Sequence, residues 1–99
     1  MTTPDPSPAA GADRVLRQFI ADDGSLHTMP TKRAKRLVVL DHVVQAFELG
    51  VVYPETEVNA VLRRFHPDVA ALRRYLVDDA FLTRDAGHYW RSGGTVDLG

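Results

Sequence analysis

The chain has 99 residues, of which 44% are hydrophobic and 25% charged, with a formal net charge of −1 and no cysteine. This length gives one domain with a single modest core, and the lack of cysteine excludes a disulfide framework, a thiolate zinc site and a cysteine nucleophile. No apolar run approaches the ~18 residues of a membrane span, and the start of the sequence lacks the basic segment and apolar core of a signal peptide. These features are typical of a soluble protein, and we expect it in the cytoplasm.

The first part of the chain predicts a leader and a short helix. Residues 1–12 are rich in proline and have almost nothing to bury, which predicts a disordered leader. Apolar residues then recur at helical spacing and predict an amphipathic helix over Asp13–Ala21. The turn-forming residues Asp22–Ser25 end this helix, and Pro30 favours an extended conformation for Leu26–Met29 before it.

The clearest pattern is a second helix, expected from Thr31, its candidate N-cap, to about Glu48. Apolar residues at helical spacing form its buried stripe, namely Leu37, Leu40, Val43, Val44 and Phe47. Gly50 is suited to stop the helix. The apolar segment Val51–Tyr53 that follows is a short strand candidate.

A third and a fourth helix follow, joined by the turn His66–Asp68. Pro54 opens the third helix, because proline suits the first helical turn. The apolar residues that we expect these two helices to bury are Val58, Val61, Leu62, Phe65, Val69, Leu72 and Leu76. The fourth helix is expected to fray around Asp78.

A two-stranded hairpin ends the folded part of the sequence. Phe81–Arg84 and His88–Arg91 alternate as strands do and are separated by Asp85–Gly87, in which glycine can take a positive φ. Neighbouring strand residues point to opposite faces, so one of Tyr89 and Trp90 should cover the core. We expect Trp90 to be the buried one.

The order helix, tight turn, helix, hairpin is that of winged helix-turn-helix domains. We therefore predict a mainly α fold with a small β-hairpin, a winged helix-turn-helix preceded by a short N-terminal amphipathic helix. The predicted organisation is a disordered leader over 1–12, the domain over 13–91 and a flexible tail over 92–99.

Several segments of the domain occur together in an order that is typical of one family. They are Pro30–Leu40, Tyr53–Asn59 and Leu72–Asp78, followed by Leu82–Arg84 and Tyr89–Arg91. On these segments the chain, from Leu26 to Arg91, resembles the prokaryotic family catalogued as domain of unknown function 2087. Relatives of this kind occur alone or attached to transcriptional-regulator domains, so the resemblance implies a nucleic-acid-linked role and no catalytic residues. Pro54 departs from the hydroxyl residue that the resemblance implies as the cap of the third helix, a loss of about 1 kcal/mol.

A cationic cluster lies at the start of the second helix. It consists of Lys32, Arg33, Lys35 and Arg36. Cations are disfavoured at this positive end of the helix dipole and repel one another, and a phosphate backbone would satisfy them. Two simpler interpretations stay open: Asp22 and Asp23 fold back and neutralise the cluster, or the cluster is a solvated surface. Lys32 and Lys35 are the favoured phosphate contacts, because the arginines flank the buried stripe.

Four further arginines complete the candidate nucleic-acid-binding set, namely Arg73, Arg74, Arg84 and Arg91. On the fourth helix Arg74 is the stronger candidate, and for Arg73 we favour a structural ion pair with Glu55, Glu57 or Asp79. Arg84 and Arg91 on the hairpin could reach a phosphate or a minor groove. The start of the fourth helix offers an acid and two alanines, whereas base reading usually takes Arg, Asn, Gln or Lys there.

The sequence offers no catalytic or metal-binding constellation. The four histidines show no paired metal-ligand spacing, and His66 beside a proline is more typical of a turn or cap. We expect no enzyme activity, no cofactor and no metal.

The leading functional hypothesis is a DNA-binding winged-helix protein with a role in transcription regulation. The alternative is a protein-interaction module that docks a partner or a second copy, forming a homodimer, through the Asp13–Ala21 helix or through Ala70 and Ala71. RNA binding is a third possibility, for which the sequence shows no exposed aromatic platform.

Overall fold

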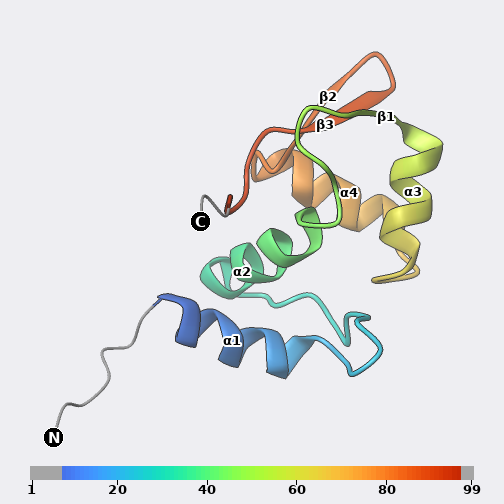
Figure 1. The fold of residues 1–99 in the computed structure, drawn as a ribbon. Helices are drawn as coiled ribbons and strands as arrows, with labels where there is room; N and C mark the ends of the chain where they lie inside the picture. The colour runs from blue at the N-terminus through green and yellow to red at the C-terminus, as the bar shows by residue number, and fades with distance from the viewer. Residues whose placement is uncertain (1–7, 97–99) are drawn as a thin grey trace, which may run out of the picture.

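The computed structural model describes residues 8–96. Along this part of the chain the elements follow in the order α1 (Pro8–Phe19), α2 (Arg33–Val44), β1 (Val52–Pro54), α3 (Glu55–Arg63), α4 (Val69–Asp78), β2 (Leu82–Asp85) and β3 (His88–Arg91). Helix α1 lies against α2 at the end opposite the sheet, and α3 and α4 lie between them and the sheet (Figure 1).

The strands form a small three-stranded antiparallel sheet in the order β1–β3–β2. Tyr89 of β3 lies opposite Tyr53 of β1 and Arg84 of β2. The expected strand at 51–53 is found one residue later, at Val52–Pro54, so Pro54 ends the strand as the N-cap of α3 and does not open the helix as predicted. The predicted hairpin is part of a larger sheet, because β1 pairs with the free edge of β3. A run of three apolar residues predicts a strand, but it does not predict which strand pairs with it, and β3 lies beyond two helices in the chain. The described part of the chain therefore combines four helices with one small sheet.

The hairpin turn is tighter than predicted. Asp85 still pairs with His88, so only Ala86 and Gly87 form the loop, with φ of 49° and 80°. Two consecutive positive φ values give the turn type that matches the twist of paired strands. Strand β2 therefore begins and ends one residue later than expected.

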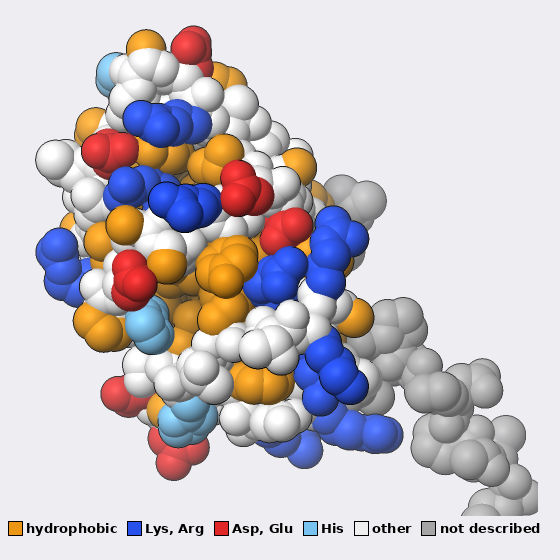
Figure 2. Space-filling model, turned by 180° about the vertical axis from the view of Figure 1, so that it is seen from behind, with side chains coloured by type: hydrophobic (Ala, Val, Ile, Leu, Met, Phe, Trp, Pro, Cys, Tyr) orange, Lys and Arg blue, Asp and Glu red, His pale blue; other side chains and the backbone are white. Residues whose placement is uncertain are grey.

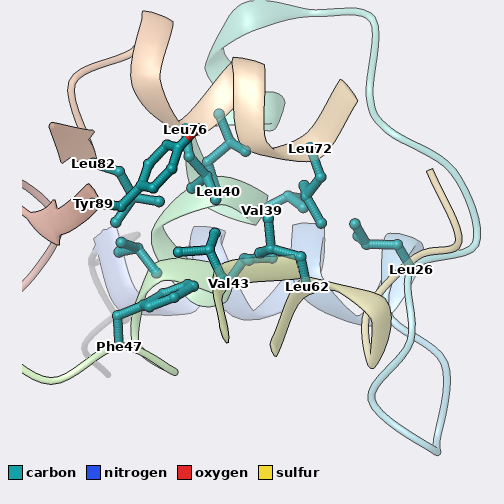
Figure 3. Close-up of a cluster of buried hydrophobic side chains, with 12 residues drawn as sticks. Leu26, Val39, Leu40, Val43, Phe47, Leu62, Leu72, Leu76, Leu82 and Tyr89 are labelled. Atoms are coloured by element: carbon teal, nitrogen blue, oxygen red, sulfur yellow. The ribbon is translucent and has the colours of Figure 1, made fainter. Parts of the chain in front are cut away.

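The core lies between α2, α3, α4 and the inner face of the sheet, where the labelled side chains of Figure 3 converge. Its buried residues are Leu26, Val39, Leu40, Val43, Val44, Phe47, Val58, Leu62, Leu72, Leu76, Leu82 and Tyr89. The predicted stripes of α3 and α4 are confirmed in their centres, Val58, Leu62, Leu72 and Leu76. On α2 the buried stripe begins at Val39, and Leu37 is only half-buried.

The expectation that Trp90 fills the core was wrong, because Tyr89 does so. Tyr89 is 1% exposed, whereas Trp90 is half-buried on the outer face beside Val52. The Tyr89 hydroxyl donates to the Glu55 carboxylate at 2.7 Å, so the buried ring keeps a partner for its polar end. The alternation along a strand requires Tyr89 and Trp90 to point to opposite faces of the sheet. The pairing of β3 with its neighbouring strands determines that Tyr89 is the one that points inward.

Helix α2 is shorter than predicted at both ends. Lys32, not Thr31, takes the N-cap position, and it forms no side-chain capping bond. After the end of the helix, the Phe47 amide donates to the Val44 carbonyl, and the Glu48 amide donates to the Tyr53 hydroxyl at 2.8 Å. The helix therefore ends before Glu48 because the turn and the strand residue Tyr53 capture its next amides.

Helix α4 starts as the sequence predicted. The Asp68 carboxylate accepts from the Ala71 amide at 3.1 Å, and the Asp68 amide donates to His66 Nδ1 at 3.0 Å. His66 and Asp68 thus fix the turn between α3 and α4, and the prediction of His66 as a turn residue is confirmed.

The predicted leader and first helix need correction. Helix α1 begins at Pro8 rather than Asp13 and ends at Phe19 rather than Ala21. Proline suits the first turn of a helix, so the helix includes part of the predicted leader, whose residues 1–7 lie outside the described residues. At its other end the chain reverses, and Ile20 pairs with Leu26.

The start of the predicted flexible tail is bound to α2. The Thr95 hydroxyl donates to Asp41 Oδ2 at 2.9 Å, and Nε2 of the Gln45 side chain donates to the Thr95 carbonyl at 2.9 Å. Residues 92–95 therefore belong to the folded domain, and residues 97–99 lie outside the described residues.

Candidate functional site

The predicted basic residues have different surroundings, and Arg91 differs most from expectation. Its side chain is buried, with the residue only 9% exposed. The guanidinium donates to the carbonyls of Gly93, Phe47 and Thr95 at 3.0, 3.3 and 2.7 Å. The prediction of Arg91 as a phosphate contact is wrong, because its donors already bond three carbonyls inside the domain.

Arg33 and Arg36 form ion pairs with Asp79, the residue that follows α4. Their nearest nitrogens lie 3.5 and 3.7 Å from its carboxylate. Arg36 also lies over the Tyr75 ring, 5.2 Å from its centroid, with only 20% of its side chain exposed. Arg36 is therefore a structural residue, whereas Arg33, with 68% of its side chain exposed, keeps an open side.

The sequence suggested that Asp22 and Asp23 neutralise the cationic cluster at the start of α2, but neither of them pairs with it in the described residues. Asp23 bonds the amide and hydroxyl of Ser25 at 2.9 and 2.6 Å, and these bonds lower the pKa of Asp23. Asp79 supplies the negative charge instead. The sequence offered no signal for this contact, because it joins the start of one helix to the end of another.

Lys32 and Lys35 line a shallow hollow at the start of α2. Phe19, Met29 and Pro30 form its apolar part. Within residues 8–96 neither lysine forms an ion pair. Their role as phosphate contacts therefore stays a prediction, with no internal ion pair among the described residues against it.

Arg73 is held inside the domain. Its Nε lies 3.7 Å from Glu55 Oε1, and its Nη1 donates to the Asn59 side chain. The expected structural ion pair is thus confirmed, with Glu55 as the acid. The hydrogen bond from Tyr89 and then the charge of Arg73 lower the pKa of Glu55, and burial and this hydrogen bond raise the pKa of Tyr89.

A second hollow lies between α4 and the hairpin and brings three of the predicted arginines together. It is lined by Ala70, Arg73, Arg74 and Asp78 of α4 and by Arg84 and Tyr89 of the hairpin. Arg74 and Arg84 are exposed and form no ion pair in the described part of the chain. The Arg84 guanidinium lies 5.9 Å from the centroid of the Tyr89 ring. The hollow therefore presents two available guanidinium groups beside one that is internally paired, with Asp78 as the nearby acid.

Basic side chains are spread along one face of the molecule. Figure 2 shows this face, with Lys and Arg from the sheet end to the end near α1 and with Asp and Glu among them. The cations are therefore interspersed with acids, and the hollow between α4 and the hairpin is where arginines of two elements meet.

On its other flank α4 borders an apolar groove that includes Ala71, one of the two alanines that the sequence suggested for docking, whereas Ala70 lines the arginine hollow. Leu26, Met29, Ala71, Leu72 and Tyr75 line it, with His66 and Asp68 at the turn. The small side chain of Ala71 is part of its wall. The groove and the arginine hollow are therefore separate surfaces on two flanks of α4.

Within residues 8–96 no group of three or more His, Asp or Glu side chains could hold a metal ion. None of the helices described is both long and apolar enough to cross a bilayer.

The comparisons with known proteins found one family. Residues 25–91 match the model of a family described as "Uncharacterized protein conserved in bacteria (DUF2087)". No curated protein and no solved structure matched the chain. The match runs from the residue before Leu26 to the end of β3, so that α1 lies outside it.

Proposed function

The chain belongs to the DUF2087 family, whose description names no activity, and we propose that it is a winged helix-turn-helix protein that binds the phosphate backbone of DNA. In this proposal α4 is the recognition helix, and the β2–β3 hairpin is the wing. The protein then acts in transcription regulation in the cytoplasm and catalyses no reaction.

The observation that carries the proposal is the hollow between α4 and the hairpin. Arg74 and Arg84 come from the two elements that contact DNA in winged-helix proteins, and they line one surface. Guanidinium groups bind phosphate oxygens through paired N–H donors. Two available arginines on neighbouring elements therefore favour a polyanion that spans both.

The exposed ridge of α4 favours backbone binding over base reading. It consists of Ala70, Arg74 and Asp78. Only Arg74 among these offers the donors that read base edges, and Asp68 before the helix is engaged as its cap. We expect modest sequence selectivity.

The open cations of α2 extend the proposed interface. Lys32 and Lys35 are assigned as flanking phosphate contacts, with Arg33 as a weaker one because Asp79 shares its charge. Arg36, Arg73 and Arg91 are assigned no direct contact, since each is bonded inside the domain.

The test is the binding of a fluorescein-labelled duplex, followed by anisotropy at several salt concentrations. Each neutralised phosphate adds about 0.9 to the slope of log affinity against log salt, so losing the phosphate that Arg74 and Arg84 bind together should lower this slope by about 0.9 in Arg74→Gln with Arg84→Gln. Arg63→Gln with Arg64→Gln is the matched control, because both are exposed arginines outside the hollow. No binding at low salt, or equal losses in the two double variants, would refute the proposal.

The apolar groove beside α4 supports a second candidate, docking of a second copy of this chain. The route through α1 is the weaker one, because Val15, Phe19 and Ile20 already pack against the core of their own domain. Docking in the groove should give a mass that rises with concentration in analytical ultracentrifugation, and Ala71→Gln should abolish the rise. A monomer at all concentrations would remove this candidate.

A further inference from the structure

We propose that Glu55 is the positioning residue of this interface: it holds α4 and the hairpin at the spacing at which Arg74 and Arg84 reach one phosphate group. The inference rests on the proposed function and adds to it the residue that sets the interface geometry. The ligand group is a single phosphate, seated in the hollow between the two elements.

One carboxylate oxygen links three elements. Glu55 lies in the first turn of α3, and its Oε1 accepts from the Tyr89 hydroxyl of β3 at 2.7 Å. The same oxygen lies 3.7 Å from Nε of Arg73 on α4. A shift of either α4 or the hairpin would break one of these contacts.

The two arginines of the hollow are each next to a group that Glu55 holds. Arg84 lies against the ring of Tyr89, 5.9 Å from its centroid and directly opposite it in the sheet register. Arg74 follows Arg73 in α4, and Arg73 also bonds Asn59 of α3. By holding Tyr89 and Arg73 in place, Glu55 therefore holds the backbone positions of Arg84 and Arg74.

The charge of Glu55 allows two explanations to be distinguished, because they predict changes of DNA affinity in opposite directions when the charge is removed. A carboxylate beside an interface for a polyanion repels it, so electrostatics alone predicts tighter DNA binding when the charge is removed. Positioning predicts weaker binding, because the arginines lose their common spacing. Glu57, an exposed acid of the same first turn, forms no ion pair in the part of the chain that is described, and it supplies the matched control.

The experiment compares duplex binding and its salt dependence in Glu55→Ala, Glu55→Gln, Tyr89→Phe and Glu57→Ala. Glu55→Ala and Tyr89→Phe should each weaken binding about tenfold, the worth of one charge-assisted hydrogen bond. Their combination should lose little more, since both break the same link. Glu55→Gln should recover most of the affinity because its carbonyl still accepts from Tyr89, and Glu57→Ala should bind unchanged or slightly tighter.

Two outcomes separate this inference from the proposed function. If Arg74→Gln with Arg84→Gln loses binding while Glu55→Ala and Tyr89→Phe keep it or tighten it, Glu55 is not a positioning residue and the proposed function stands. If the arginine variant keeps full binding, both fail. Circular dichroism checks each fold, and Tyr89→Phe, which keeps the buried ring, tests the link even if Glu55→Ala does not fold.

Discussion

The two basic regions of the molecule have similar side chains in different surroundings. At the start of α2, Arg33 and Arg36 share Asp79, which comes from the end of α4. In the hollow between α4 and the hairpin, Arg74 and Arg84 have no such partner within residues 8–96, and the nearby carboxylate of Glu55 is taken by Arg73.

This difference shows that tertiary contacts decide which cations are available. The positive end of the α2 dipole disfavours its arginines, and Asp79 offsets that cost from another helix. In the hollow, Glu55 pairs with Arg73 and leaves Arg74 and Arg84 without an ion pair among the described residues. A cationic cluster in the sequence is therefore evidence for a partner only after the carboxylates around it are known.

The largest effect is expected for an arginine that belongs to neither region. Arg91→Met removes the donors of three carbonyl groups and should lower the free energy of unfolding by about 2 to 3 kcal/mol in urea titration. Arg84→Met, at an exposed position, should cost less than about 0.5 kcal/mol. Equal losses would contradict the assignment of Arg91 as structural and Arg84 as available.

Removing the acid that pairs with α2 should make the two basic regions alike. Asp79→Asn releases Arg33 and Arg36, and duplex affinity at low salt should rise roughly threefold. Stability should change by less than about 1 kcal/mol, since the carboxylate also lies at the unfavourable end of α4. Asp22→Asn makes the same change in net charge on an exposed loop, and an equal rise there would attribute the effect to net charge alone.

The link between Glu55 and Tyr89 predicts a dependence of stability on pH at both ends of the range. The pKa of Glu55 is lowered from about 4.5, so its contribution is present above that pH and is lost as pH falls through the lowered value. The pKa of Tyr89 is raised from about 10, so its contribution is present below pH 10 and is lost above the raised value. Denaturant unfolding between pH 3 and pH 11 should show both losses, with the alkaline one absent in Tyr89→Phe.

The smallest effect concerns the hairpin that carries Arg84. Ala86 has a φ of 49°, which asparagine tolerates better, so Ala86→Asn should stabilise the protein by about 0.5 kcal/mol. Duplex affinity should not change, because the surroundings of Arg84 are kept. A loss of stability in thermal unfolding would count against the turn geometry.

Local patterns in the sequence predicted the fold where the determining contacts are local. The turn His66–Asp68 precedes α4 as predicted, and the strand His88–Arg91 has the predicted bounds. The partner of β1 and the inward side of β3 were not predictable in this way. The partner of β1 lies beyond two helices in the chain, and alternation along β3 does not say which of Tyr89 and Trp90 points inward.

The candidate site was predictable as a set of residues and not as an arrangement. The sequence named Arg74 and Arg84 and anticipated the ion pair of Arg73. It grouped them with Arg91, and it ranked Arg36 below the lysines without predicting its ion pair. Burial by the segment after β3 and pairing with Asp79 distinguish these two, and both arise only on folding.

The most direct test of the account is the arginine Nε–H spectrum of the protein, recorded by NMR as a duplex is added. We predict that the signals of Arg74 and Arg84 shift with saturation, whereas those of Arg36 and Arg91 stay in place. Shifts that are largest at Arg33 and Arg36, or no shift at any arginine, would contradict the claim that the hollow between α4 and the hairpin is the binding surface.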